Sequence, residues 1–441
     1  MDQVSAIILA GGGGKRMQSL GAGMPKPLVK VGGRPVIFRQ IDSLRTQAIT
    51  RIVVVAGHLS HILASALEDE FGSQIAVVVE PRPLGTGGSL SLVRSHLSAH
   101  NIVLSGDLVF EVDFARLLRF HREKFADITL TTHPNSHPLD SDLVVIEGQT
   151  QQIKAILTRP HPEEFRYANL VNASIAVVRS SIWDTIADGV EANFERDIVA
   201  ANLRAGKRVF SYRTSEYIAD MGTPQRWERV ERDLAAGLNQ SRALTKGQRA
   251  VFIDRDGVLN LFKGDITRPE QVQLLPDVAA GLKVLNGSPY LAILVTNQPH
   301  AAKGFCTVDD LIEVNKELET QLGNDGAKLD DIFMCIHHPE TGHFGEDAEL
   351  KIDCECRKPK AGMILAAKEK YNIDLSSSFL IGDSPADILA GKRAGLKTIL
   401  LGTALDASLE REDSEPDYRL GDFLAAVQMI VSQPPHLGEQ I

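Results

Sequence analysis

Val251-Phe252-Ile253-Asp254-Arg255-Asp256-Gly257-Val258 is the stretch that decides the fold of the second half of this 441-residue chain. Its apolar residues predict a buried strand that ends in two carboxylates. Side chains two residues apart in an extended segment project to the same side. Asp254 could therefore attack a phosphorus atom while Asp256 manages protons. A calcium loop of the EF-hand type is excluded, because Lys263 stands where that loop needs glutamate.

Polar groups follow two further apolar runs in this half. A strand ending at Val295 is followed by a hydroxyl and an amide that suit phosphate oxygens, and a strand ending at Gly382 is followed by more carboxylates. A short basic segment between them supplies cations. The residues concerned are Thr296, Asn297, Arg357, Lys358, Asp383 and Asp387.

Three of the four cysteines lie close together in the sequence, in two tight pairs that flank one loop. Cys335 and His337 form the first pair, and Cys354 and Cys356 form the second. Three thiolates and one imidazole are typical of a tetrahedral structural zinc site. His338 is the alternative ligand in the first pair, and Cys306 lies far outside the cluster.

The second half resembles the haloacid-dehalogenase-like (HAD-like) phosphatases from about Ala250 to Gly402, because its four motifs stand in the family order. This resemblance implies a doubly wound parallel sheet, with Asp254 as the nucleophile and Asp256 as the general acid/base. The pattern C-x-H-H-P…C-x-C-R-K-P resembles the heptose bisphosphate and histidinol phosphatase branch, favours His337 as the zinc ligand, and looks more like its heptose members. The resemblance further implies phosphate binding by Thr296, Asn297, Arg357 and Lys358, and Mg²⁺ binding by Asp254, Asp383 and the backbone carbonyl of Asp256, with Asp387 in support.

A glycine-rich loop opens the first half. The predicted strand Ala6–Ala10 runs into Gly11-Gly12-Gly13-Gly14-Lys15-Arg16, and glycines at this place let backbone N–H groups approach a phosphate. The loop is not a P-loop, because Leu9 and Arg16 occupy two of the required positions. Arg16 also replaces the third glycine of the dinucleotide-binding pattern.

Further motifs in the first half are Pro25-Lys26-Pro27-Leu28, the segment 80–88, Ser105-Gly106-Asp107 and Asp220-Met221-Gly222-Thr223-Pro224. Together with the glycine loop, they resemble the sugar-1-phosphate nucleotidyltransferase family over about Ala6 to Arg229. The resemblance implies a Rossmann-like fold in which a sugar 1-phosphate attacks the α-phosphorus of an NTP and releases pyrophosphate. It further implies a nucleotide cradle of Gly11, Gly12 and Gly14, phosphate neutralisation by Arg16 and Lys26, substrate contacts from Glu80, Gly85, Thr86 and Asn172, and Mg²⁺ ligands Asp107 and Asp220. Arg159 occupies the family's phosphate-contact segment.

Short apolar runs, such as the predicted strand Arg51–Ala56, alternate with helical patterns, such as the predicted helix Val36–Thr46, along the chain, which indicates an α/β protein. We expect domains at 1–237 and 249–432, a linker at 238–248 and a flexible tail at 433–441. The formal net charge of −10 argues against nucleic-acid binding. No apolar run reaches the length of about 20 residues that spans a bilayer, and no signal peptide is recognised, so we expect a cytoplasmic protein without a membrane partner.

The two resemblances together suggest consecutive reactions on one sugar. A phosphatase would remove the C7 phosphate of D-glycero-D-manno-heptose 1,7-bisphosphate, and a nucleotidyltransferase, with GTP as the expected donor, would activate C1 for surface polysaccharide. One alternative pairs a hexose-1-phosphate nucleotidyltransferase with a histidinol-phosphate-type phosphatase. Another makes the first half a nucleotide sensor that controls the phosphatase. The motifs leave the base, the anomer and the oligomeric state open.

Overall fold

The computed structural model describes residues 3–12, 23–148, 150–162, 165–402 and 415–433. The chain divides into two compact units. Unit 1 comprises residues 1–133, 141–159 and 170–243, and unit 2 comprises residues 134–140, 160–169 and 244–441. The boundary at Ala243 falls inside the segment that the sequence predicts as a linker.

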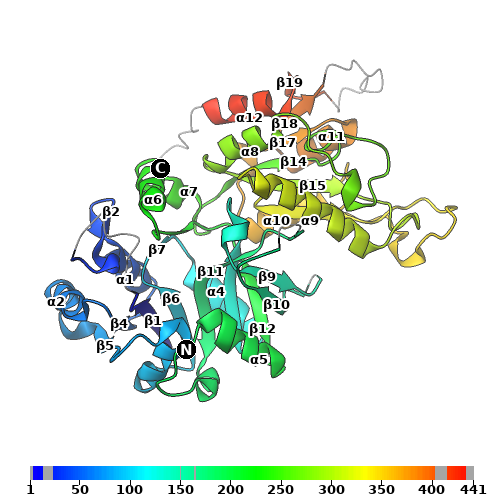
Figure 1. Cartoon of the computed structure of the whole chain (residues 1–441). Coiled ribbons are helices and arrows are strands. Elements are labelled where there is room, and N and C mark those ends of the chain that lie inside the picture. The colour runs from blue at the N-terminus through cyan, green and yellow to red at the C-terminus, as the bar shows by residue number, and fades with distance from the viewer. Residues whose placement is uncertain (1–2, 13–22, 149, 163–164, 403–414, 434–441) are drawn as a thin grey trace. The chain divides into compact units, whose positions relative to one another are not determined.

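Unit 1 is built on a nine-stranded mixed sheet with the order β10-β9-β11-β6-β1-β4-β5, and β8 and β12 extend it beside β11 (Figure 1). Strand β1 (Val4–Ala10) pairs in parallel with β4 (Arg51–Ala56) on one side and with β6 (His100–Ser105) on the other. The chain order reverses at β1, and ligands of parallel sheets bind at such a switch point. Gly11 and Asp107 lie just beyond β1 and β6, so both predicted contacts lie at that edge.

The predicted strands and helices of this half are confirmed with small shifts of their ends. The predicted helix Val36–Thr46 matches α1 at both ends. Its buried residues recur with helical spacing, so one face packs on the sheet. The remaining elements of unit 1 are β2 (Lys30–Val31), β3 (Arg34–Pro35), β5 (Ala76–Val79), β7 (Leu108–Phe110), β8 (Ile128–His133), β9 (Leu143–Ile146), β10 (Ile153–Leu157), β11 (Val171–Arg179), β12 (Val209–Arg213), β13 (Ile218–Asp220), α2 (Ser60–Phe71), α3 (Gly85–Gly88), α4 (Phe114–Glu123), α5 (Ala200–Arg204), α6 (Pro224–Ala235), α7 (Leu238–Ser241), η2 (Lys26–Leu28), η3 (Gly72–Gln74), η4 (Ser89–His96), η6 (Ser180–Thr185) and the π-helix η7 (Phe194–Val199).

Unit 2 is built on a six-stranded parallel sheet with the order β16-β15-β14-β17-β18-β19. Strand β14 (Arg249–Ile253) lies at the centre, where the order reverses toward β17 (Phe379–Gly382). This is the predicted doubly wound sheet. The other elements are β15 (Tyr290–Asn297), β16 (Asp331–Cys335), β18 (Lys397–Leu401), β19 (Tyr418–Leu420), α8 (Val278–Asn286), α9 (Val308–Asn324), α10 (Gly362–Tyr371), α11 (Pro385–Ala394), α12 (Phe423–Ser432), η5 (Pro138–Asp140), η8 (Pro269–Gln271), η9 (Ala348–Leu350) and η10 (Leu375–Ser377).

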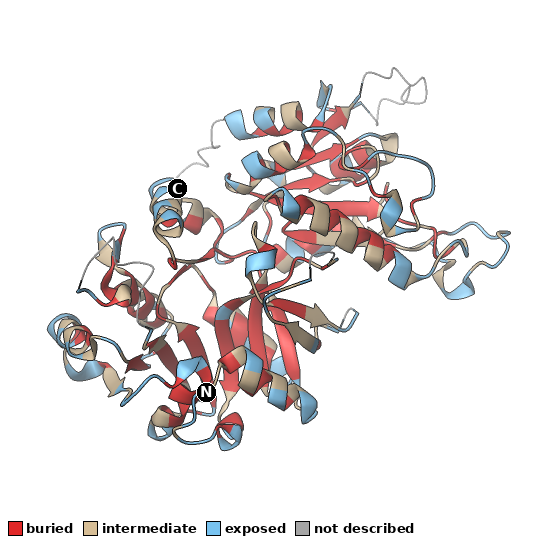
Figure 2. Ribbon diagram, in the orientation of Figure 1, coloured by how far each residue is buried: buried red, intermediate tan, exposed pale blue. Residues whose placement is uncertain are grey.

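Each unit has its own hydrophobic core, and buried residues concentrate on the strands of both sheets (Figure 2). Apolar residues cover both faces of the central strands, as expected where helices pack on the two sides of a parallel sheet. The central strand β14 illustrates this: Val251 packs into one core cluster and Phe252 into another, and both are fully buried.

The segment predicted as a linker has more structure than its polar composition suggests. Gly237, with φ of +69°, ends α6, and the next four residues form the short helix α7. Leu244 is buried in the core of unit 2. Residues 434–441 of the predicted tail lie outside the described residues. Among the residues whose positions are described, no helix combines the length and apolar character that crossing a bilayer requires.

Candidate active sites and metal centre

The predicted nucleophile of unit 2 lies at the switch point of the sheet. Asp254 directly follows β14, and its backbone N–H donates to the carbonyl of Ile381 at 3.0 Å, which ties it to β17. Asp383 follows the end of β17. A Cβ on Gly257, which has φ of +81°, would lie 1.9 Å from Asp383 Oδ2, so only glycine fits between the two loops. The sheet therefore brings together carboxylates that lie 129 residues apart in the sequence.

Lys358 is the buried cation at this site. Its Nζ lies 2.8 Å from Asp254 Oδ1 and 2.6 Å from Asp387 Oδ1, and it donates to the carbonyl of Val295 at 2.8 Å. Burial lowers the pKa of Lys358, but the two carboxylates outweigh that effect and raise it. Lys358 is therefore a permanent positive charge beside the nucleophile.

Three carboxylates of this site could hold a metal ion. Oxygen atoms of Asp254, Asp383 and Asp387 lie within 4.8 Å of one another. Burial and the charge of Asp387 raise the pKa of Asp254, and the same two causes raise the pKa of Asp383 to about 6. Burial and repulsion between the carboxylates both disfavour their charged forms, and a divalent cation offsets both effects. The donor set is therefore the all-oxygen type that Mg²⁺ prefers.

The carboxylate of Asp256 is not part of this group of three. Arg255 binds it with two nitrogens at 3.1 Å each, and Gln298 and Asn260 donate to it at 2.6 and 3.0 Å. Burial raises the pKa of Asp256, but the charge of Arg255 outweighs it and lowers the pKa. Asp256 is thus held as a carboxylate. The sequence analysis gave Asp387 a supporting role at the Mg²⁺ site, and in the structure its carboxylate lies among the clustered oxygens.

The remaining residues expected to bind phosphate have different surroundings. Asn297 Oδ1 accepts from the Lys358 N–H and Asn297 Nδ2 donates to the Lys358 carbonyl, both at 3.0 Å. This amide is thus engaged with the backbone of Lys358 and positions it, and the expected phosphate contact stays a prediction. Thr296 is buried and accepts from Gln298 at 2.9 Å. Arg357 Nη1 donates to the carbonyl of His337 at 3.4 Å.

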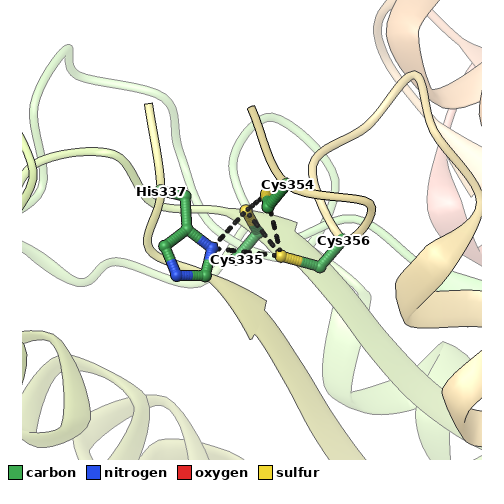
Figure 3. A group of neighbouring side chains, drawn as sticks. All are labelled: Cys335, His337, Cys354 and Cys356. Atoms are coloured by element: carbon green, nitrogen blue, oxygen red, sulfur yellow. Dashed lines mark hydrogen bonds between the residues drawn. The ribbon is translucent and has the colours of Figure 1, made fainter. Parts of the chain in front are cut away.

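The predicted Cys₃His set converges at the end of β16 (Figure 3). The sulfur of Cys356 lies 3.2 Å from that of Cys335, 3.1 Å from that of Cys354 and 3.3 Å from His337 Nδ1. Four donors placed about 2.0–2.3 Å from one zinc ion have comparable mutual separations. His338 Nδ1 instead accepts from the N–H of Glu340 at 3.3 Å. The four residues therefore fit a closed tetrahedral metal site.

Unit 1 has a pocket of about 870 Å³ at its own switch point. It is lined by Gly11, Gly12, Lys26, Glu80, Gly85, Thr86 and Asp107, together with Gly57, Arg82, Ser105 and Gly222. Gly14 and Arg16 lie outside the described residues. The structure thus gathers seven of the predicted residues around one cavity large enough for a nucleotide.

Glu80 lies close to the glycine loop in this pocket. A Cβ on Gly11 would lie 2.1 Å from Glu80 Oε2, and a Cβ on Gly57 would lie 2.8 Å from the same atom. Burial raises the pKa of Glu80. These two glycines let the carboxylate of Glu80 enter the wall of the pocket, where it also accepts a backbone hydrogen bond from Leu84.

Both predicted magnesium ligands of unit 1 are paired with cations. Lys26 forms an ion pair with Asp107, and Ser105 Oγ donates to Asp107 at 2.6 Å. Arg226, in the first turn of α6, binds both oxygens of Asp220 at 2.9 Å. Pairing of β13 with β7 sets Asp220 opposite Leu108, the neighbour of Asp107. The magnesium site expected at these two carboxylates stays a prediction, and Arg226 is a partner that sequence reasoning missed.

Asn172 is placed next to a residue that the motifs did not single out. Its Nδ2 donates to Glu195 Oε1 at 2.8 Å. Arg159 and Asn172 both contact Asp142. The Nε of Arg159 lies 3.5 Å from Asp142 Oδ1, and the N–H of Asn172 donates to the Asp142 carbonyl at 3.2 Å. Nothing in the local sequence pattern links Glu195 to Asn172, since only the tertiary fold brings them together.

Comparison with known proteins agrees with this division of the chain. A family model described as nucleotidyl transferase matches residues 5–237, and one described as HAD-hydrolase-like matches residues 355–426. The chain belongs to the nucleotidyl transferase family. Mannose-1-phosphate guanylyltransferase of Mycobacterium tuberculosis is 29% identical over 259 residues, which cover 58% of this chain and 71% of that protein.

The second half of this nucleotidyl transferase family member has relatives of its own. D-glycero-beta-D-manno-heptose-1,7-bisphosphate 7-phosphatase of Pasteurella multocida is 39% identical over 154 residues, 35% of this chain and 81% of that protein. D-glycero-alpha-D-manno-heptose-1,7-bisphosphate 7-phosphatase of Burkholderia mallei is 37% identical over 163 residues, 36% and 82% of the two chains. The second half belongs to the same family as these phosphatases. The chain thus joins a nucleotidyltransferase to a phosphatase.

Proposed function

We propose that the chain makes a nucleotide-activated heptose in two steps. The phosphatase half would hydrolyse the C7 phosphate of D-glycero-D-manno-heptose 1,7-bisphosphate, and the nucleotidyltransferase half would transfer GMP from GTP to the resulting heptose 1-phosphate. The observation that carries this proposal is the presence of both sites on one chain, beside relatives named for heptose bisphosphates and for guanylyl transfer. The proposed substrates are small phosphorylated molecules, and we place the chemistry in the cytoplasm, in lipopolysaccharide precursor synthesis.

Asp254 would act as the nucleophile of the phosphatase. Its carboxylate oxygen attacks the C7 phosphorus, the bond from phosphorus to the C7 oxygen breaks, and an aspartyl-phosphate forms. The leaving C7 oxygen takes a proton from Asp256, which acquires that proton from solvent when the phosphate dianion binds beside it. Lys358 neutralises the charge of the transferring phosphoryl group. Asp256, held as a carboxylate by Arg255, takes a proton from the water that then attacks the intermediate, which restores Asp254 and releases phosphate. Mg²⁺ held by Asp254, Asp383 and the Asp256 carbonyl would supply further charge neutralisation.

The zinc site would act through the backbone next to Lys358. Zn²⁺ held by Cys335, His337, Cys354 and Cys356 would be structural, because all four positions are filled by protein ligands. Cys356 directly precedes Arg357 and Lys358 in the chain. We therefore infer that this metal holds the segment that delivers the phosphate-binding lysine.

In the nucleotidyltransferase half, Lys26 and Arg16 would neutralise the phosphates of GTP, and Asp107 and Asp220 would hold Mg²⁺, which compensates the charge of the leaving pyrophosphate. The carboxylate of Glu80 is an acceptor that complements the N–H donors that guanine carries on its Watson–Crick edge. Uracil offers a single N–H there, flanked by carbonyl oxygens that a carboxylate repels. Glu80 thus supports GTP as the donor.

The test is to incubate the full chain with heptose 1,7-bisphosphate, Mg²⁺ and each NTP separately. We expect phosphate release with any NTP and pyrophosphate release with GTP alone. Asp254→Asn should reduce phosphate release by about a thousandfold or more, yet leave turnover of supplied heptose 1-phosphate unchanged. If both activities fell together, the model of two independent sites would be wrong.

Mannose 1-phosphate is a second candidate substrate, because the Mycobacterium tuberculosis relative is named for it. Supplying mannose 1-phosphate and heptose 1-phosphate in separate reactions distinguishes the two sugars by kcat/KM. A nucleotide-sensing role for the first half predicts phosphate release with no pyrophosphate from any NTP. The paired carboxylates Asp107 and Asp220 argue against that role, because a sensor does not need metal ligands at the reacting phosphates.

A further inference from the structure

The strand that carries Asn172 is irregular at that residue. The pairing of β11 with β8 shifts its register between Asn172 and Ala176. Within this interval Ser174 has φ of +56°, a left-handed conformation that costs a residue other than glycine about 1 kcal/mol or more. Bulges of this kind re-aim side chains and concentrate next to active sites. The strain indicates that the direction of Asn172 matters.

Glu195 fixes the side-chain amide of Asn172. Its Oε1 accepts one N–H of Asn172 at 2.8 Å, and Asn172 Oδ1 faces the N–H of Ser174 at 3.4 Å. These two contacts determine which end of the amide is nitrogen and which is oxygen. One N–H and one lone pair remain available, a pair of groups that suits a sugar hydroxyl.

The same short segment also holds the nucleotide pocket. Phe194, the first residue of η7, donates its N–H to Thr86 Oγ1 at 2.9 Å. The glycines of α3 pack on the backbone just before η7, since a Cβ on Gly85 would lie 2.5 Å from the Ala192 carbonyl oxygen and one on Gly88 would lie 2.0 Å from that of Val190. A π-helix is uncommon, and its occurrences concentrate at functional sites.

Acceptor groups and one cation lie near Glu195. Burial raises the pKa of Glu195, and the carboxylate of Asp142 raises it further. Asp142 lies 3.5 Å from Arg159 Nε, the cation in the segment that corresponds to the family's phosphate contact. Asp142 is also linked to Asn172, whose N–H donates to the Asp142 carbonyl at 3.2 Å, so acceptors for hydroxyl groups and one cation neighbour Asn172.

We propose that Glu195 is a positioning residue for the sugar 1-phosphate, acting through Asn172. The inference rests on the proposed nucleotidyl transfer and deepens it. Glu195 holds Asn172 in the orientation that binds the sugar, and Phe194 in the same helix holds Thr86 at the nucleotide. The sugar contact and the nucleotide pocket are thus supported by one six-residue segment.

The test measures the kinetics of the full chain with heptose 1-phosphate and GTP varied separately. Glu195→Leu, which removes the acceptor, should raise the KM for the sugar 1-phosphate about tenfold and leave the KM for GTP within about twofold. Glu195→Gln keeps an acceptor oxygen and should restore most of the affinity. The matched control is Glu191→Gln, four residues earlier and exposed, which should behave as wild type.

A double-mutant cycle separates positioning from a direct contact. In an Asn172→Ala background, Glu195→Leu should change the KM for the sugar 1-phosphate less than twofold, because its target is already gone. A tenfold rise in that background would overturn the proposal, as would equal increases in both KM values with a lowered Tm. The second result would mean that Glu195 only supports the fold.

Calorimetric titration of the full chain with heptose 1-phosphate, mannose 1-phosphate and glucose 1-phosphate gives a readout that does not need turnover. Binding weakened by Glu195→Leu, without pyrophosphate release from wild type, would support the positioning role while contradicting the proposed function. Binding unaffected by Glu195→Leu, with normal wild-type turnover, would contradict the positioning role alone. If the wild-type chain bound none of the three sugar phosphates, both the positioning role and the proposed function would be contradicted.

Discussion

Lys358 contacts more groups of the phosphatase site than its sequence motif predicts. The C-R-K-P motif indicates only that a lysine is available for phosphate. In the structure this lysine is almost fully buried, and its ammonium group contacts Asp254, Asp387 and a backbone carbonyl. The side chain of Asn297 accepts a hydrogen bond from the backbone N–H of Lys358. A buried cation with so many partners has little freedom, so its charge is fixed where a phosphoryl group would be transferred.

The pH dependence of magnesium binding follows from the raised pKa values of two carboxylates. Burial and Asp387 raise the pKa of Asp383 to about 6, and the pKa of Asp254 is also raised. Because protons and Mg²⁺ compete for these oxygens, the affinity for Mg²⁺ should fall by about tenfold or more between pH 8 and pH 5.5. Titration calorimetry of the phosphatase site, in an Asp107→Asn chain that removes a proposed ligand of the other site, measures this change.

The stability of the protein without bound Mg²⁺ should show the opposite trend with pH. A raised carboxylate pKa means that the folded state binds more protons than the unfolded state, so Asp383 stabilises the fold more at pH 5 than at pH 7.5. This contribution is lost as the pH rises from the unfolded value near 3.8 through about 6. Asp383→Asn is the control and should lack it. A pH-independent affinity for Mg²⁺ would contradict the raised pKa values of Asp254 and Asp383.

Glu80→Gln tests base selection at a single residue. Replacing one carboxylate oxygen by an NH₂ group leaves guanine facing a donor where it needs an acceptor. We expect kcat/KM for GTP to fall about 10- to 100-fold and the relative use of UTP to rise, because an amide complements its N–H and carbonyl oxygen. Unchanged selectivity among the four NTPs would remove Glu80 from base recognition. Glu123→Gln, the same change at an exposed residue outside the pocket lining, is the control.

At the scale of elements, the segment from β16 to α10 illustrates how a metal site and a catalytic site are joined. Cys335 ends β16, and Cys354 and Cys356 return the chain to Lys358. Residues 336–353 between them contain only one described short helix, η9. Few backbone hydrogen bonds stabilise such a segment, so a bound ion would contribute much of its order.

Cys354→Ser should therefore separate zinc from activity. We expect loss of bound zinc by elemental analysis and a fall of about tenfold or more in phosphatase kcat/KM, because the segment that carries Lys358 loses its support. Nucleotidyl transfer to supplied heptose 1-phosphate should be unchanged. Cys306→Ser, a change of the same type outside the cluster, is the control and should retain full zinc content. Zinc loss without any effect on the phosphatase would contradict the structural link to Lys358.

For the whole molecule, two separate cores predict two ligand-specific stabilities. Ala6 and Ile8 belong to a core of unit 1, while Val251 and Ile253 belong to a core of unit 2. A ligand stabilises the unit that binds it. In thermal unfolding of the full chain, a non-cleavable GTP analogue with Mg²⁺ should raise one transition, and zinc chelation should lower the other. A single transition that moves with both ligands would show that the units unfold together.

How far the sequence predicts each unit depends on the range of the interactions. The predicted helix Val36–Thr46 and strand Arg51–Ala56 were recovered at their exact ends, because both are determined by local hydrophobic periodicity. The Cys₃His cluster was also predictable, since thiol and imidazole side chains in tight pairs have few other uses. The segment 238–248 was not, because its burial depends on Leu244 packing in a core made by distant strands.

The sequence by itself determined the two halves, the order of their motifs, and the residue types that handle phosphate and metal. Only the tertiary structure decided which side chains serve others: Asn297 holds Lys358, Arg255 holds Asp256, Arg226 pairs with Asp220, and Glu195 orients Asn172. The physical reason is that hydrogen-bond partners are set by strand order and packing. Local patterns report only whether a residue is apolar, polar or charged.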